Sequence, residues 1–142
     1  MTWHPEDHTT GLRIIDTHPL PPGIAGLTDG TTIWLSPDLT PAGRRCTLAH
    51  ELVHIERGIH PDLPGPLAAR EESTVEMTAA RRLVPLDQLI DAILWAQGDG
   101  DHAGLASDLD VDQSVVEFRL AAVTPEEEAQ IQRALAALEQ IP

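Results

Sequence analysis

One helix, predicted for residues 41–57, constrains the fold of this chain more than any other segment. Thr40 is a typical N-cap, Pro41 suits the first helical position, and Gly58 follows the last residue of the periodic pattern. The apolar residues between these ends repeat at helical spacing and form one stripe: Cys46, Ala49, Leu52, Val53 and Ile55. The sequence therefore predicts a well-capped amphipathic helix.

This helix carries the motif His50-Glu51-Leu52-Val53-His54. Residues four apart share one face of a helix, so His50 and His54 can present two imidazole rings to one Zn²⁺ ion, at roughly 2.0–2.1 Å. Glu51 lies beside such an ion, where it can take a proton from a metal-bound water and pass it to a leaving amine. The motif indicates a metal-dependent peptidase. The simpler interpretation is two surface histidines with an incidental glutamate.

A catalytic zinc site needs a third protein ligand, with one position left for water. The next predicted helix, residues 67–83, offers Glu71, Glu72 and Glu76. Glu72 and Glu76 are four apart and share a face, so we expect Glu72 to bind the metal and Glu76 to accept the second ring N–H of a zinc-bound histidine. Two alternatives stay open: Glu76 is the ligand, or the acidic face is simply solvated.

The two helices together resemble the ImmA/IrrE family of metallopeptidases, which are minimal gluzincins. The matching residues are 47–54, then Glu72-x-x-x-Glu76-x-x-Ala79-Ala80-x-x-Leu83-Val84-Pro85. The chain departs from the family pattern at residues 74–76, which read Thr-Val-Glu where members often carry Glu-Ala-Asn. The resemblance implies a zinc metallo-endopeptidase that cleaves or inactivates a helix-turn-helix transcriptional repressor.

The remaining patterns predict an α+β fold. Short β-branched or apolar segments around an Asp-Gly turn predict strands at residues 12–17, 24–27 and 31–36. Further helices are predicted at residues 86–97, 102–109, 112–121 and 125–139, the last opened by a capping box. We expect a small N-terminal antiparallel sheet packed on a zincin-type helical core over residues 1–98. A small acidic helical subdomain, residues 99–142, is expected to pack on that core.

A peptidase also has to stabilise the oxyanion of its tetrahedral intermediate, and this chain has no tyrosine to do so. His60, in the loop between the two motif helices, is our first candidate for this catalytic role, ahead of His18 and Arg81; a merely exposed loop histidine is the simpler interpretation. We expect the strand at residues 31–36 to form the edge beside the cleft, where substrate adds as a further strand. Trp34 then lies in the core or in the cleft wall.

Charge limits the partners of the chain. Its net charge is −14, and residues 86–142 carry 12 acidic residues against two arginines, a net of −10. Residues 102–121 have spacing like a small helix-turn-helix, yet Arg119 is their only arginine. Such a surface repels phosphate, so we expect no direct nucleic acid binding. The acidic half either favours a basic protein partner or only aids solubility.

Other features favour the cytoplasm as the expected location of the chain. No stretch has the pattern of a signal peptide, and no apolar run approaches the length of a membrane span. The single Cys46 excludes an internal disulfide framework.

Two functions compete with a peptidase. One is a zinc-containing protein-binding module that regulates a transcription factor without efficient proteolysis. The other is a metal-free partner of chaperone or toxin–antitoxin type.

Overall fold

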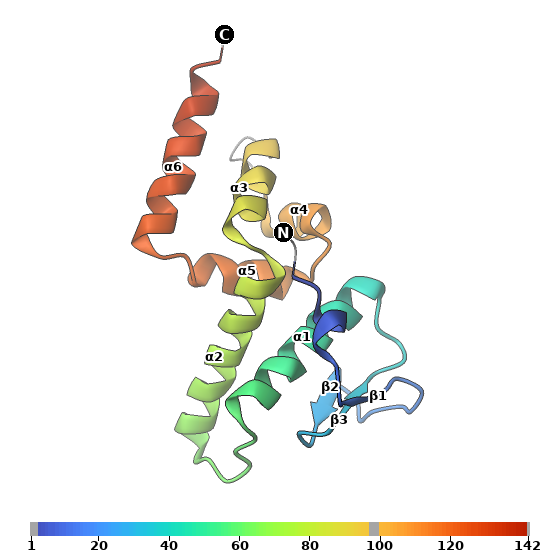
Figure 1. Ribbon diagram of the computed structural model, residues 1–142. Helices are drawn as coiled ribbons and strands as arrows, with labels where there is room; N and C mark the ends of the chain where they lie inside the picture. The colour runs from blue at the N-terminus through green and yellow to red at the C-terminus, as the bar shows by residue number, and fades with distance from the viewer. Residues whose placement is uncertain (1–2, 97–99, 142) are drawn as a thin grey trace.

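The computed structural model describes residues 3–96 and 100–141. The first elements are the 3-10 helix η1 (Pro5–His8), strands β1 (Arg13–Ile15), β2 (Gly26–Thr28) and β3 (Thr32–Leu35), and helices α1 (Pro41–Arg57) and α2 (Gly65–Leu83). Then come helices α3 (Leu86–Trp95), α4 (His102–Leu109), α5 (Gln113–Ala121) and α6 (Pro125–Glu139). Figure 1 shows the strands grouped apart from the later helices, which confirms the predicted α+β class. Within these described residues, no helix has both the length and the apolar character to cross a membrane.

The sheet is mixed, whereas we expected an antiparallel one. Its order is β1-β3-β2, and only the β2–β3 hairpin is antiparallel. In the hairpin turn, Asp29 Oδ1 accepts hydrogen bonds from the backbone N–H groups of Thr31 and Thr32, at 2.9 and 2.8 Å, and Gly30 adopts a φ of 100°. The chain reverses direction twice between β1 and β3, once through the loop at residues 16–25 and once at this turn. β1 therefore runs parallel to β3.

Helix α1 lies between the sheet and the other helices and is buried on two sides. Leu48 and Leu52 pack against Ile33 and Leu35 of β3. The other buried apolar residues of α1 belong to a second core, shared with the later helices: Cys46, Ala49 and Val53. The stripe predicted from the sequence is thus divided between two cores. Full burial of a leucine or isoleucine side chain contributes roughly 1.5–3 kcal/mol, so even the four-residue core attaches the sheet firmly to α1.

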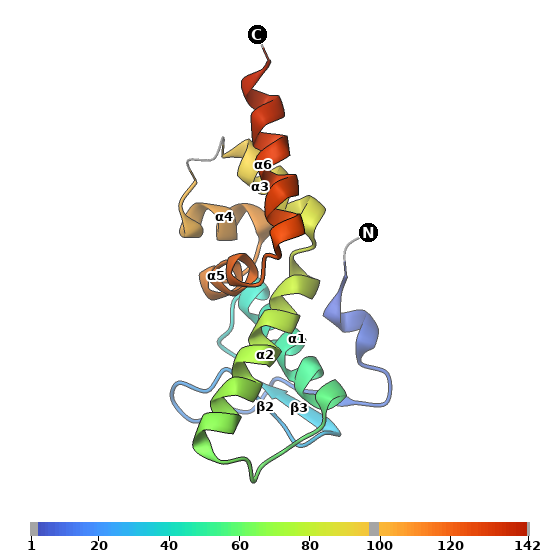
Figure 2. The same ribbon diagram turned by 90° about the vertical axis from the view of Figure 1, so that its left-hand side faces the viewer.

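The second core contains side chains from both before and after residue 98 in the sequence. Val75, Leu83 and Leu89 precede that position, and Val116 and Ile131 follow it. Gln97 and Gly98, where we predicted the end of α3, lie outside the described residues. Figures 1 and 2 agree that α6 extends alongside α3, away from the sheet, and ends at the C-terminus.

A buried charge cluster joins α2, α5 and α6. The side chain of Arg119 is inaccessible; its Nε donates to the carbonyl of Val84 at 2.7 Å and its Nη2 donates to Glu127 at 2.9 Å. Arg81 donates to the other carboxylate oxygen at 2.9 Å, and Glu127 also closes the predicted capping box with Thr124. Burial opposes ionisation, but these hydrogen bonds outweigh it and lower the pKa of Glu127 to about 2.

We predict that Glu127→Gln destabilises the fold, because the charge of Arg119 then stays buried without its counter-charge. We expect a loss on the order of 3 kcal/mol in the free energy of unfolding, measured by urea denaturation at pH 7. Glu128→Gln, at an exposed position on the same helix, is the matched control and should change stability by less than about 0.5 kcal/mol.

The destabilisation caused by Glu127→Gln should depend on pH. The pKa of Glu127 is lower in the folded state, so its contribution is complete above its ordinary pKa of 4.5 and is lost as pH falls from there towards 2. The stabilities of the wild type and of Glu127→Gln should therefore converge over this range. A difference that stays constant into acid would contradict this account.

Candidate metal centre

His50 and His54 lie one turn apart on α1, on the face that neither core covers. Their side chains are 18% and 24% exposed, and their rings meet edge to face with centroids 4.8 Å apart. The helix that carries them begins and ends as predicted. Thr40 accepts a hydrogen bond from the Gly43 N–H at 3.0 Å, and Gly58 takes a φ of 92° at the C-terminal end. The two rings are therefore presented from a rigid, doubly packed support.

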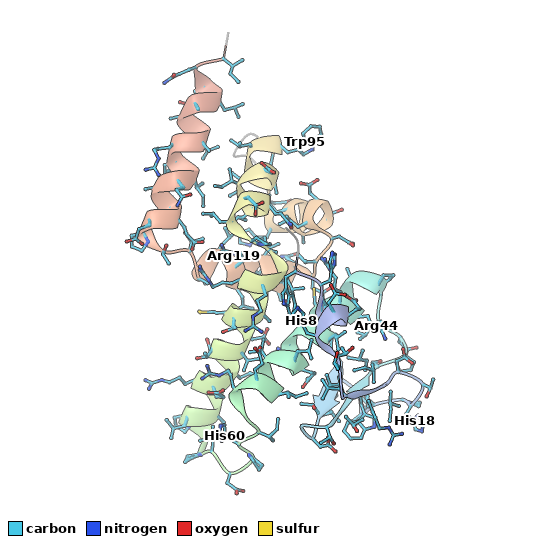
Figure 3. The ribbon with its side chains drawn as sticks, in the orientation of Figure 1. His8, His18, Arg44, His60, Trp95 and Arg119 are labelled. Carbon is cyan, nitrogen blue, oxygen red and sulfur yellow. The ribbon has the colours of Figure 1, made fainter. Side chains whose placement is uncertain are left out.

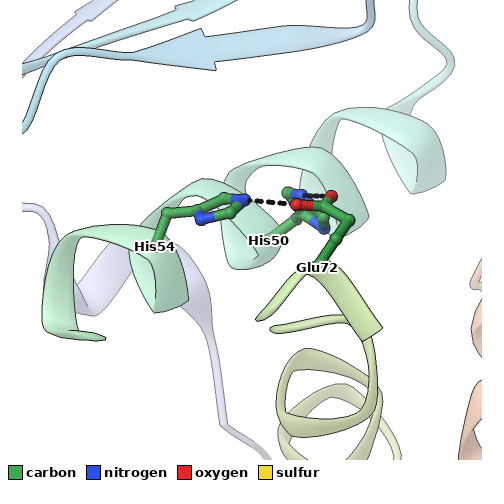
Figure 4. Close-up of side chains that lie close together, drawn as sticks. All are labelled: His50, His54 and Glu72. Carbon is green, nitrogen blue, oxygen red and sulfur yellow. Dashed lines mark ion pairs between the residues drawn. The ribbon is translucent and has the colours of Figure 1, made fainter. Parts of the chain in front are cut away.

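Helix α2 brings Glu72 against both rings (Figure 4). Its Oε1 lies 2.7 Å from His50 Nε2, and its Oε2 lies 3.0 Å from His54 Nε2. One ligand atom from each of the three residues lies within 4.8 Å of the other two. Around a tetrahedral zinc ion with bonds of 2.0–2.1 Å, neighbouring ligand atoms are roughly 3.3 Å apart. The His-His-Glu group thus has the chemistry and spacing to hold a metal ion.

Glu76 contacts the opposite side of the His50 ring. Its Oε1 is 3.3 Å from His50 Nδ1, so a proton on Nδ1 can be donated to Glu76 while Nε2 keeps its lone pair towards Glu72. Burial of His50 lowers its pKa, but the hydrogen bond with Glu76 and the nearby carboxylate charges outweigh burial, so the pKa is raised. Glu71 instead forms an ion pair with Arg57. This geometry favours Glu72 over Glu76 as the ligand.

Glu51 is a buried carboxyl group, only 6% exposed, directly beside the His-His-Glu group. Burial raises its pKa, and the nearby His50 and His54 oppose that rise only in part. Glu51 lines the space on both sides of the metal-binding group. A carboxyl group in this position, with its pKa displaced towards neutrality, can exchange a proton with water bound in the cleft.

Two hollows meet at the metal-binding group and form one cleft. The first, of 370 Å³, lies between the loop before β2, α1 and the start of α5. The second, of 350 Å³, lies between β2, the end of α1 and the loop that follows it. The residues that line both are Gly26, His50, Glu51 and Glu72. A larger hollow of 690 Å³ lies beside η1 and includes none of these four.

The strand beside the cleft is β2, which corrects our expectation for residues 31–36. β3 occupies the centre of the sheet and is paired on both edges, whereas β2 is an outer strand. Sequence reasoning also missed Gly26. A Cβ atom there would lie 2.5 Å from Thr47 Cγ2 and 3.4 Å from Glu51 Cγ, so only glycine lets β2 approach the motif helix this closely. Sequence reasoning also missed Asp112 and Ser114, which lie at the start of α5 and line the first hollow.

Of the three oxyanion candidates, His60 is the one that lines the cleft. Its ring is exposed and lies with Nε2 3.3 Å from the carbonyl oxygen of Arg57. Arg81 instead donates to Ala122 and Glu127, in the buried cluster at the other end of α2. His18 contacts Thr17 in an exposed loop, well apart from His60 (Figure 3).

Residues 7–121 match the family model of the IrrE N-terminal-like domain, a peptidase family. The chain belongs to this family. The match runs from η1 through α5, includes both helices of the metal-binding group and confirms the resemblance seen in the sequence. No curated protein and no solved structure shows significant similarity to the chain. Family membership and the His-His-Glu group together make this a metallopeptidase-like domain with a possible metal site.

We predict that Glu72→Gln abolishes stoichiometric metal binding, because Glu72 is the one carboxylate among the described residues that contacts both rings at Nε2. Glu76→Gln should keep the site but weaken zinc affinity about 10–100-fold, since it loosens the support of His50. Zinc content after gentle purification and competition with a chelating dye measure both effects. Glu71→Gln, one residue away, is the control and should bind zinc like the wild type; equal losses in all three variants would refute this ligand assignment.

Proposed function

We propose that this protein is a zinc-dependent metallo-endopeptidase of the gluzincin type, acting in the cytoplasm on a helix-turn-helix transcriptional repressor. One observation carries the proposal: His50, His54 and Glu72 converge on one point, with the buried carboxyl group of Glu51 beside them. Membership of a peptidase family supports the reaction class. The repressor as substrate follows from the ImmA/IrrE resemblance, and the strongly acidic chain suits a basic, DNA-binding partner.

Two imidazoles and one carboxylate are a donor set typical of catalytic zinc, with one position left open. His50, His54 and Glu72 would hold the ion, and Glu76 would keep His50 in the tautomer that offers Nε2. When bound, zinc supplies Lewis acidity that polarises the scissile carbonyl and makes water a better nucleophile at neutral pH.

Glu51 moves the proton. Its carboxylate accepts a proton from the attacking water as the water oxygen bonds to the carbonyl carbon. It then delivers that proton to the amine nitrogen as the C–N bond breaks. The raised pKa of Glu51 suits a group that must both take and return a proton. His60, at the rim of the same cleft, is placed to donate a hydrogen bond to the developing oxyanion.

The substrate binds as an extended segment along β2. An outer strand offers backbone N–H and C=O groups to an added strand, and β2 runs directly above the residues that perform the chemistry. The side chains of such a segment would enter the two hollows on either side of the scissile bond. Gly26, which lines both hollows, lets β2 lie close to Thr47 and Glu51 of α1, so a segment added to β2 would lie near the proton carrier.

We predict that Glu51→Gln lowers the rate of substrate cleavage by at least about 100-fold while zinc content stays unchanged, because only the proton carrier is lost. The assay is co-expression with a neighbouring helix-turn-helix regulator, followed by detection of its fragments. Glu56→Gln, an exposed position on the same helix, is the control. Regulation that survives Glu51→Gln would instead favour a zinc-containing module that binds its regulator without efficient proteolysis.

A second prediction tests the role of β2. In Gly26→Ala the new methyl group meets Thr47, so β2 or Glu51 must shift. A misplacement near 1 Å can cost on the order of 100-fold in rate, and we expect a loss of at least about tenfold with zinc content intact. Gly65→Ala is the matched control, since a Cβ atom there meets nothing within 4 Å. Wild-type cleavage by Gly26→Ala would contradict the requirement for close contact between β2 and α1 at this position.

A further inference from the structure

Trp95 is an exposed aromatic side chain at the end of α3, with 81% of its surface accessible. The indole extends outward from the helix end, on the far side of the molecule from His60 (Figure 3). By contrast, Trp3 and Trp34 are half-buried. Tryptophan is enriched among the residues that dominate the binding energy of protein interfaces, and an indole beside a hollow offers a large aromatic surface to a partner.

Two hollows adjoin the indole. One, of 410 Å³, lies between Trp95 and α4, and the other, of 390 Å³, extends along α3 towards Leu109. Ala92, Trp95 and Asp108 line both. Ala92 is buried and forms the floor between the two helices. We call this continuous depression the α3–α4 groove.

The α3–α4 groove is acidic. Asp91, Asp101 and Asp108 line it, and among the described residues that line it none carries a positive charge. Asp101 caps α4 by accepting from the Gly104 N–H at 2.7 Å, while Asp91 and Asp108 are exposed on the two helices. An aromatic face flanked by carboxylates is complementary to a cation, and it repels nucleic acid phosphates.

We propose that the α3–α4 groove is a docking site for an arginine side chain in a basic segment of a protein partner. The guanidinium group stacks on the indole of Trp95 and donates a forked pair of hydrogen bonds to Asp108, while its methylene groups cover Ala92. Lysine fits less well, since it lacks the planar fork. The groove is separate from the metal centre, so this binding does not depend on the proposed peptidase activity.

The probe is a capped peptide, acetyl-Ser-Leu-Arg-Arg-Leu-Ser-amide, titrated into the full chain and followed by NMR through the indole N–H signal of Trp95. We expect a saturable shift of that signal, and at least about tenfold weaker binding when both arginines are replaced by uncharged citrulline. For Trp95→Ala, binding is followed through the backbone amide signals of α4, and the affinity for the peptide should fall about tenfold. Asp108→Asn should lower the same affinity about fivefold. Mass spectrometry confirms that the peptide stays intact.

Glu126→Gln is the matched control, because it removes one exposed carboxylate from α6 and leaves the groove unchanged. Its affinity for the peptide should stay within about twofold of the wild type. Equal weakening by Glu126→Gln and Asp108→Asn would show attraction to net negative charge alone and overturn the proposal. So would the absence of a saturable shift. Self-association of the chain that Trp95→Ala abolishes would assign the groove to a second copy and overturn it as well.

Discussion

The burial of α1 on two sides is the constraint on which the rest of the structure depends. Leu48 and Leu52 attach the sheet to one side of this helix, and Ala49 and Val53 pack against the other helices. Only one strip of the helix is left for the cleft, and it carries the two histidines. Because each side is held by apolar packing, the rings need no contact with solvent-exposed loops to keep their position.

Packing between α1 and α2 also explains why so many carboxylates can gather at one point. Small buried side chains, Ala49 on α1 with Val75 and Ala79 on α2, let the two helices approach closely. Ion pairs between Arg57 and Glu71 and between Arg82 and Glu56 connect the two helices at the surface. The close approach of the two helices holds Glu72 and Glu76 against His50, an arrangement whose mutual repulsion a divalent cation would relieve.

The later, acidic helices pack beside the His-His-Glu group that could hold a metal ion. Arg119 and Glu127 lock α5 and α6 to the end of α2, and the start of α5 forms one wall of the cleft. The spacing like a helix-turn-helix in residues 102–121 thus serves packing, with its only arginine buried at 1% exposure. The groove at Trp95 lies at the outer side of the same helical layer, apart from the cleft.

The sequence by itself determined the features that arise from local periodicity and capping. It predicted the helices and the hairpin, and it placed His50 and His54 together because residues four apart meet on one helix face whatever the surroundings. The packing of α2 against α1 then brings Glu72 against both rings. Only the tertiary structure decided which strand borders the cleft, why Gly26 must be glycine, and that Arg81 faces Glu127 and not the cleft. These depend on strand order and helix packing between distant segments, which local patterns do not encode.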